Sequence, residues 1–236
     1  MRGVDVHGAK GPIDWHKVKA AGYDFAFVKC SEGISFNDPR YHVNLADARR
    51  AGLHVGSYHF ARPDHNQPED EAHSFAAKLW LLPGDLLPAL DFETAPHSAS
   101  WALRFLLALG AKIGHKPIFY SYSSFIQGMA APPALGGYPL WLANYRSTLP
   151  EVPKPWRYAA IWQHSSSGSV PGIGGHVDLN KLILPAIEPL LYKPAPKPLT
   201  PQPKRSGLWR NSVVDVGRTL VWDPARRMFT LLRRGG

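Results

Sequence analysis

The sequence predicts an α/β protein built on a parallel sheet with crossover helices. In the first half of the chain, short apolar runs are each followed by a helical pattern, which is the order of elements in such a sheet. The chain has 236 residues, 44% of them hydrophobic, and this suits one α/β domain of barrel size with a short appendage.

The predicted elements follow one another in order. Asp14 is placed to cap the first helix, and Gly22 and Gly52 lie where helices stop. Beyond Pro117 helical patterns become rare, and short strands joined by loops take over. The expected strands are 3–6, 25–30, 55–60, 86–92, 117–121, 141–145, 159–164 and 177–180, and the expected helices are 14–21, 39–51, 68–82 and 100–114.

Positive charge is concentrated at the end of the chain. Residues 1–191 hold 17 Lys and Arg against 16 Asp and Glu, whereas residues 192–236 hold 10 against 2, so this tail carries +8 of the net +9. The main domain is nearly neutral, so we expect no nucleic-acid partner. Prolines alternating with basic residues predict a linker at 192–206, and residues 207–236 predict a short basic β-rich tail with strands 213–222 and 228–232.

The single cysteine, Cys30, excludes an intramolecular disulfide and a four-thiolate zinc site. The first residues lack the basic stretch and apolar segment of a secretion signal, and no apolar run reaches membrane-spanning length. We therefore expect synthesis in a cytoplasm and arrival outside the cell by another route.

Two carboxylates one residue apart end the fourth predicted strand. Asp91 and Glu93 would share a face, because side chains at i and i+2 of a strand do so. Their proximity would raise the proton affinity of at least one of them. A protonated carboxyl group beside an ionised one is what glycosidic bond cleavage requires. An isolated pair of this kind is more often a turn cap beside a solvated glutamate, so the rest of the chain must decide.

Polar and aromatic side chains fall at the ends of the other predicted strands as well. In a parallel barrel these ends open on one rim, where such folds build their sites. Rings stack on sugar C–H surfaces while acids and amides bind hydroxyl groups, so the set is typical of a sugar-binding cleft. The residues are Asp5, Glu32, Tyr58, His59, Asp91, Glu93, Tyr120, Asn144, Tyr145, Gln163 and Asp178.

Eight segments extend this pattern in order through roughly residues 1–190. They are Gly3-Val4-Asp5-Val6, Gly11-Pro12-Ile13-Asp14-Trp15, Phe27-Val28-Lys29-Cys30-Ser31-Glu32-Gly33, the run from Ala51 to Phe60, Leu90-Asp91-Phe92-Glu93, Trp141-Leu142-Ala143-Asn144-Tyr145, Trp162-Gln163 and Val177-Asp178-Leu179-Asn180. With these segments the sequence resembles glycoside hydrolase family 25, the Chalaropsis-type muramidases that cut bacterial peptidoglycan.

The resemblance implies an irregular, flattened TIM-like (β/α) barrel over residues 1–191. It implies hydrolysis of the β-1,4 bond between N-acetylmuramic acid and N-acetylglucosamine, with no metal or organic cofactor. Glu93 would be the general acid and Asp91 its partner, and Asp5 and Asp178 would be two further acids in the cleft. The residues expected to bind the substrate are Glu32, Tyr58, His59, Tyr120, Trp141, Asn144, Tyr145 and Gln163.

Two mechanisms are compatible with these residues. In the favoured one the substrate's 2-acetamido oxygen attacks the anomeric carbon while Glu93 donates a proton and Asp91 stabilises the oxazolinium cation. In the other, Asp5 or Asp178 acts as the nucleophile or as the base for water.

We expect a monomer that acts on peptidoglycan glycan strands as a phage endolysin, or else as a bacterial autolysin or secreted competitor. The basic tail would contact anionic wall polymers or a membrane surface.

Three other interpretations are open at this point. Eleven histidines could belong to a zinc-dependent cell-wall amidase, although no H-E-x-x-H spacing is present. The same cleft could bind glycan without cutting it. Cys30 could be a nucleophile with His59 as its base, but the apolar neighbours of Cys30 favour a buried core thiol.

Overall fold

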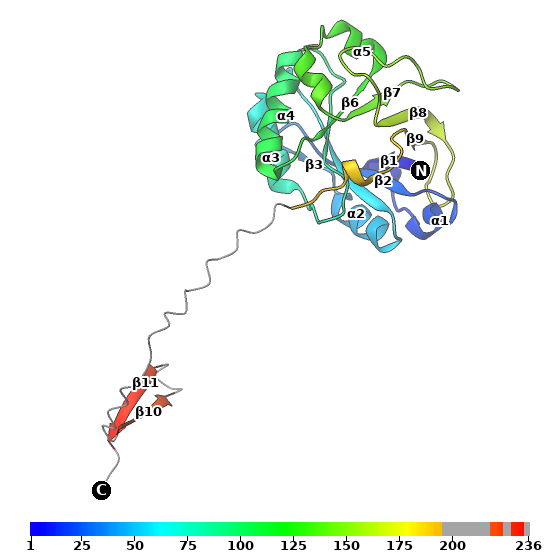
Figure 1. The fold of residues 1–236 in the computed structure, drawn as a ribbon. Coiled ribbons are helices and arrows are strands. Elements are labelled where there is room, and N and C mark those ends of the chain that lie inside the picture. The colour runs from blue at the N-terminus through cyan, green and yellow to red at the C-terminus, as the bar shows by residue number, and fades with distance from the viewer. Residues whose placement is uncertain (195–217, 224–227, 234–236) are drawn as a thin grey trace. The chain divides into compact units, whose positions relative to one another are not determined.

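The structure, a computed structural model, describes residues 1–194 and the backbone of residues 218–223 and 228–233. The chain divides into two compact units, Met1–Ala195 and Pro196–Gly236. The first unit is a barrel surrounded by helices (Figure 1). Among the described residues, no helix is long and apolar enough to cross a membrane.

Eight strands close the barrel because β1 pairs with both β2 and β9. Neighbours from β1 through β8 run parallel, whereas β9 runs antiparallel to β8 and to β1. A two-residue strand, β3 (Phe36–Asn37), extends β2 outside the barrel. The barrel strands are β1 (Arg2–Val6), β2 (Phe25–Glu32), β4 (His54–Phe60), β5 (Ala89–Asp91), β6 (Ile118–Tyr122), β7 (Leu140–Ala143), β8 (Ile161–Gly168) and β9 (Val177–Leu182).

The predicted α/β TIM-like barrel is confirmed, with one correction to its strand directions. All eight predicted strands form, although β5 is shorter than the expected 86–92. The expectation that every site residue follows the C-terminal end of its strand is wrong for Asp178, which lies at the start of the antiparallel β9. An antiparallel strand begins at the rim where its parallel neighbours end, so Asp178 still reaches the same rim.

The helices begin and end where the sequence places stop and cap residues. The side chain of Asp14 accepts a hydrogen bond from the Lys17 backbone N–H, and Ser98 caps the fourth helix in the same way through the Trp101 N–H. Gly114 ends that helix with φ 73°, a left-handed conformation that favours glycine. The α-helices are α1 (Trp15–Ala20), α2 (Tyr41–Arg50), α3 (Pro68–Lys78), α4 (Ala99–Ile113) and α5 (Ser123–Gly128).

Two of these helices differ from the prediction. The third was expected to reach residue 82, but the chain turns to extended conformation at Leu79. The short α5 was not predicted at all. In the described residues, β7, β8 and β9 are connected by loops, as expected for the second half of the chain.

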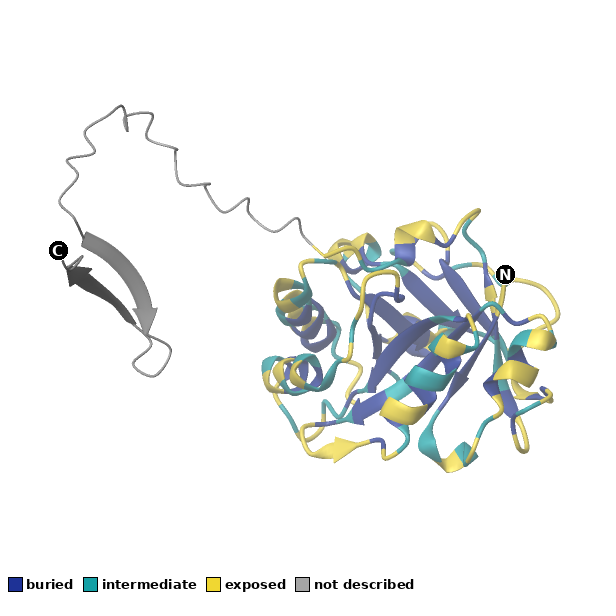
Figure 2. Ribbon diagram, turned by 90° about the horizontal axis from the view of Figure 1, so that it is seen from below, coloured by how far each residue is buried: buried dark blue, intermediate teal, exposed yellow. Residues whose placement is uncertain are grey.

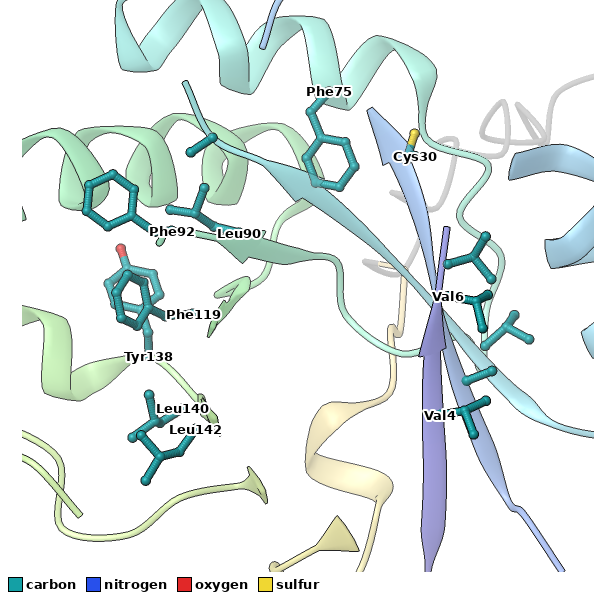
Figure 3. Packing of buried hydrophobic residues seen from close by; sticks show 14 of the residues in the cluster. Val4, Val6, Cys30, Phe75, Leu90, Phe92, Phe119, Tyr138, Leu140 and Leu142 are labelled. Atoms are coloured by element: carbon teal, nitrogen blue, oxygen red, sulfur yellow. The ribbon is translucent and has the colours of Figure 1, made fainter. Parts of the chain in front are cut away.

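Apolar side chains alternate along the strands between two layers. One layer lies inside the barrel and includes Phe25 and Phe27, and the other lies between the barrel and its helices. Figure 3 shows Leu90 and Phe92 of β5 and its extension in the outer layer, with Phe75 projecting from α3. Figure 2 shows the strands as the buried centre and the outer surfaces of the helices as exposed. This two-layer packing fixes the direction of each strand residue, and therefore which residues can enter the site.

The end of the barrel unit extends slightly past the predicted boundary at residue 191. The Tyr192 N–H donates to the Asp85 carbonyl (2.7 Å), and the Gly84 N–H donates to the Tyr192 carbonyl (3.0 Å). Tyr192 therefore belongs to the barrel unit, and the rest of the predicted linker, from 195 onward, lies outside the described residues. In the second unit β10 (Arg218–Asp223) pairs antiparallel with β11 (Met228–Arg233), close to the two strands that the sequence predicts.

Candidate active site

A cleft with a cavity of about 270 Å³ opens at the rim where the parallel strands end. Acids, tyrosines and an amide dominate its walls, as the sequence predicts for a sugar site. The residues that line it are Asp5, His7, Lys29, Tyr58, Phe60, Asp91, Glu93, Tyr120, Trp141, Tyr145, Gln163 and Asp178. All four predicted acids are therefore brought together.

The strand alternation aims Asp91 and Glu93 at this cleft. Ala89 packs inside the barrel, while Leu90 and Phe92 pack outward against the helices. Asp91 and Glu93 thus face inward together, as residues at i and i+2 do. The outward anchoring of Leu90 and Phe92 holds the pair in place, because rotating either carboxylate outward would bury it in an apolar layer.

Asp5 and Asp178 enter the cleft as directly opposed residues of the antiparallel pair β1 and β9. Two buried amides hold Asp5: Gln163 Nε2 donates to its Oδ1 (3.0 Å), and Asn180 Nδ2 donates to the same atom (2.7 Å). Side chains opposed in this way lie close enough to interact. The Asp5 carboxylate is therefore fixed by hydrogen bonds while a second carboxylate faces it.

All four acids are shifted toward the protonated form. Burial, together with the charge of Asp178, raises the pKa of Asp5 to about 7. Burial and the charge of Glu93 raise the pKa of Asp91 well above its usual range. Burial also raises the pKa of Glu93; the charge of Asp178 adds to this shift and the Tyr120 hydroxyl opposes it. Burial raises the pKa of Asp178 too, and the charge of Lys10 opposes that shift. The site therefore holds titratable protons at neutral pH.

Asp91 and Glu93 share their protons as a pair. Asp91 is the more deeply buried of the two, and burial pushes its pKa up the more strongly. In the free protein Asp91 therefore holds its proton tightly. This differs from the sequence-based hypothesis, in which Asp91 is ionised. Its Oδ1 is buried and has no hydrogen-bond partner within the described part of the chain. A buried oxygen without a donor adds to the cost of ionising Asp91, in keeping with its raised pKa.

Aromatic rings form the floor of the cleft. The Trp141 ring stacks on Phe27, with centroids 4.5 Å apart, and Tyr120 meets it edge-on at 4.8 Å. Trp141 Nε1 donates to Asn180 Oδ1 (2.8 Å), and the hydroxyl groups of Tyr120 and Tyr145 both donate to Gln163 Oε1 (2.9 and 3.1 Å). The rings are thus locked before any ligand binds, which lowers the entropic cost of binding.

Three residues predicted to bind substrate do not line this cleft. His59 points outward from β4, since Tyr58 before it points inward, and its ring stacks between Phe75 and Phe105 with no exposed surface. The prediction that His59 contacts the sugar is therefore wrong, and so is its suggested role as base for Cys30, whose pKa burial raises to about 11.

Glu32 and Asn144 also lie outside the cleft. Glu32 accepts hydrogen bonds from Lys29 Nζ (2.7 Å) and Arg62 Nε (2.7 Å), so its charge is used within the barrel wall. Asn144 Nδ2 donates to Ser123 Oγ (2.8 Å) at the edge of a neighbouring cavity. Glu32 stands opposite the cleft residue Phe60 in the register of β2 with β4, and its two cations hold it at the rim. Asn144 turns to the neighbouring cavity.

Sequence reasoning missed Asn180 and Lys29. Asn180 lies in the interior of β9 and joins Asp5 to Trp141 through the two hydrogen bonds given above. Lys29 lines the cleft, and its charge opposes the upward pKa shift of Asp91. A polar residue within an apolar strand run was the available signal in both cases, since such a residue must have a partner when buried.

Comparison with known proteins agrees with this geometry. The family model described as Glycosyl hydrolases family 25 matches residues 4–173. The chain belongs to this family. Lysozyme M1 of Streptomyces globisporus is 32% identical over 202 residues, covering 77% of this chain and 67% of that protein. The N,O-diacetylmuramidase of Chalaropsis sp is 28% identical over 207 residues, covering 77% of this chain and 98% of that protein.

Solved structures of family 25 relatives share the barrel. The bacterial lysozyme from Streptomyces coelicolor is 30% identical and superimposes with a TM-score of 0.75, covering 80% of this chain and 95% of that one. As a member of family 25, this chain is a glycoside hydrolase. The zinc-amidase interpretation loses its basis, because an amidase cuts a different bond in the wall.

Proposed function

We propose that this glycoside hydrolase is an N-acetylmuramidase that cuts the β-1,4 bond between N-acetylmuramic acid and N-acetylglucosamine in peptidoglycan. One observation carries the proposal beyond family membership. Four carboxyl groups with raised pKa values converge on one cleft, and none of them makes an ion pair with a residue of the described ranges. Such groups can donate protons near neutrality, which glycoside cleavage requires.

In the favoured mechanism the substrate supplies its own nucleophile. Glu93 donates its proton to the glycosidic oxygen as the bond from that oxygen to the anomeric carbon breaks. The acetamido oxygen forms the new bond to that carbon and gives an oxazolinium ion. Water then opens this ring, and Glu93 takes back the proton from the water.

Asp91 is suited to orient the acetamide. Asp91 lines the cleft, where its carboxylate can accept the amide N–H, and a positive charge develops next to it as the oxazolinium forms. Both interactions favour the ionised carboxylate, so substrate binding would shift the proton of the pair toward Glu93. The required protonation states thus arise in the complex rather than in the free protein.

The competing mechanism uses Asp5 or Asp178 as the nucleophile or as the base for water. Stereochemistry separates direct attack by water from substrate assistance, because the first inverts the anomeric centre and the second retains it. Proton NMR of freshly formed products should show the β-anomer first. Initial formation of the α-anomer would replace substrate assistance with the water-activating scheme.

Digestion of purified peptidoglycan followed by mass spectrometry tests the bond that is cut. We expect fragments that end in reducing N-acetylmuramic acid. Reducing glucosamine ends would make the protein a glucosaminidase, and binding without new reducing ends would make it a non-catalytic module. The Glu93→Gln protein serves as the control for any contaminating hydrolase.

The basic tail is proposed as an anchor to anionic wall polymers or to a membrane surface. Truncation after Ala195, at the limit of the barrel unit, should weaken sedimentation with walls and its sensitivity to salt, while cleavage of short soluble fragments stays the same. Unchanged sedimentation would remove this role. Host lysis by a phage, with synthesis in the host cytoplasm, stays a prediction from the sequence, with wall turnover in a bacterium as the alternative.

A further inference from the structure

The cleft continues past Glu93 into a second cavity of about 570 Å³. Glu93, Tyr120 and Tyr145 line both cavities, so the two form one groove. The second cavity takes its own walls from the end of β6, from α5 and from the loop after β7. The residues that contribute are Tyr122, Ser123, Ser124, Gln127, Ala143, Asn144 and Arg146.

The position of Glu93 between the two cavities decides which part of the glycan each one receives. This step rests on the proposed function. The general acid protonates the oxygen that joins the two sugars, so the scissile bond lies beside Glu93. The sugar that reacts at its anomeric carbon lies with Asp91 and Asp5, which line only the first cavity. The second cavity therefore lies on the side of the leaving sugar.

The two cavities differ in charge. Four acids line the first, whereas Glu93 is the one acid and Arg146 the one cation among the residues that line the second. Arg146 is exposed and makes no ion pair with any residue that the structure describes. An arginine whose charge is unused at the end of an acidic groove is suited to an anionic part of the substrate.

Hydrogen bonds hold the loop that carries Arg146 against the barrel. The Arg146 N–H donates to the Asn144 carbonyl (3.0 Å), which also accepts from Trp162 Nε1 (2.8 Å). The Asn144 side chain donates in turn to Ser123 Oγ (2.8 Å) on α5. The backbone of Arg146 is thus fixed relative to Glu93, which a residue that reads substrate requires.

We propose that the second cavity binds the leaving part of the glycan and that Arg146 binds a carboxylate of its muramic acid. The first leaving sugar, N-acetylglucosamine, carries no carboxylate, but the next sugar is muramic acid. A cavity about twice the volume of the first has room for this longer segment. The carboxylate comes either from the lactyl group of a peptide-free muramic acid or from the stem peptide, and a guanidinium binds both in the same way.

Kinetics on soluble glycan strands test the proposal with Arg146→Gln, Arg146→Lys and a control, Arg157→Gln. Arg157 is also an exposed arginine, but it lines a cavity at the opposite end of the barrel, with residues that precede β5 and β7. We expect Arg146→Gln to raise KM about 5-fold to 10-fold and to leave kcat unchanged, with a smaller effect at high salt. Arg146→Lys should recover part of the loss, and Arg157→Gln should match the wild type.

Chemical blocking of the carboxylates separates charge recognition from a loss of packing. On strands whose carboxyl groups have been amidated with methylamine, wild type and Arg146→Gln should have the same KM. Strands with and without stem peptides identify the source, because removal of the peptide frees the lactyl carboxylate. An equal rise in KM on amidated strands, or no rise on any strand, would overturn the proposal. If wild type cleaves none of the strands, the proposed function itself fails.

Discussion

Two groups of acids in this barrel differ in whether a basic side chain pairs with them. In the cleft, the four carboxyl groups lack ion-pair partners among the described residues, and their pKa values are raised. In the layer outside the barrel, Glu71 accepts from His59 Nε2 (2.8 Å) and from Asn66 Nδ2 (2.7 Å). At the rim, opposite Phe60, burial alone would raise the pKa of Glu32, but Lys29 and Arg62 outweigh it and lower the pKa.

Strand β4 contributes residues both to the cleft and to the layer outside the barrel. Tyr58 of β4 points into the cleft and His59 points out of it, so adjacent residues contribute to unlike environments. A bulge between Lys29 and Ser31 shifts the register of β2, and Ser31 then meets His59, with Ser31 Oγ 2.9 Å from His59 Nδ1. Burial lowers the pKa of His59, although Glu71 opposes this. Glu71 and Glu32 accept hydrogen bonds from basic or amide side chains, whereas the acids in the cleft have raised pKa values.

Replacing one acid from each group tests the comparison most strongly. Glu93→Gln should lower kcat on the order of 10²–10⁴-fold, because the amide cannot donate a proton to the leaving oxygen. Glu32→Gln, the matched change at an ion-paired acid, should lower kcat far less. Release of reducing ends from peptidoglycan measures both, with circular dichroism to confirm folding. Equal losses would show that the division between ion-paired acids and acids without an ion-pair partner has no catalytic meaning.

Glu71→Gln should affect stability rather than catalysis. The buried carboxylate accepts from His59, Asn66 and the Arg62 N–H, and an amide of the same shape replaces one acceptor oxygen by a donor. We expect a loss of about 1–3 kcal/mol in the free energy of unfolding, with kcat close to that of the wild type. Urea denaturation measures the loss. A stable but inactive protein would place Glu71 in the catalytic group.

Asp5→Asn should stabilise the protein in a pH-dependent manner. The pKa of Asp5 is about 7 in the folded protein against a usual 3.8, so between these values the folded state holds a proton that the unfolded state lacks. The contribution of Asp5 to stability therefore falls as pH rises from 4 to 7 and stays low above 7. Asparagine stays neutral and keeps the Oδ1 acceptor for Gln163 and Asn180.

We expect Asp5→Asn to be more stable than the wild type by about 1–3 kcal/mol at pH 8, with little difference at pH 4. Urea denaturation at the two pH values measures this, and lower activity should accompany the gain. A difference that is the same at both pH values would show that the charge of Asp5 is not responsible.

Local pattern was sufficient for most of the cleft. The period of two in the run that ends at Asp91 and Glu93 places both carboxylates on the inner face, and the barrel confirms it. The same period, applied to Tyr58, already places His59 on the other face. The alternation therefore argues against a place for His59 in the cleft, although His59 stands at a strand end.

Other features depend on contacts between distant segments. The direction of β9 leaves no mark in its apolar pattern, because a period of two reads the same both ways. The bond from Asn180 to Asp5 joins residues 175 positions apart and follows from the register of β1 with β9. The turn of Glu32 toward Arg62 depends on a partner 30 residues away. These are properties of the closed barrel, and no short window of sequence contains them.

The smallest expected effect concerns Cys30, which belongs to the apolar layer outside the barrel. Burial raises the pKa of its thiol to about 11, so little thiolate is present at neutral pH. Cys30→Ala should leave kcat unchanged and cost about 1 kcal/mol of stability, since it removes one buried sulfur atom. Iodoacetamide should likewise modify the folded protein slowly and without loss of activity. Rapid alkylation with inactivation would mean that the layer around Cys30 opens to solvent. The distinction between the static groups of that layer and the titrating acids of the cleft would then fail.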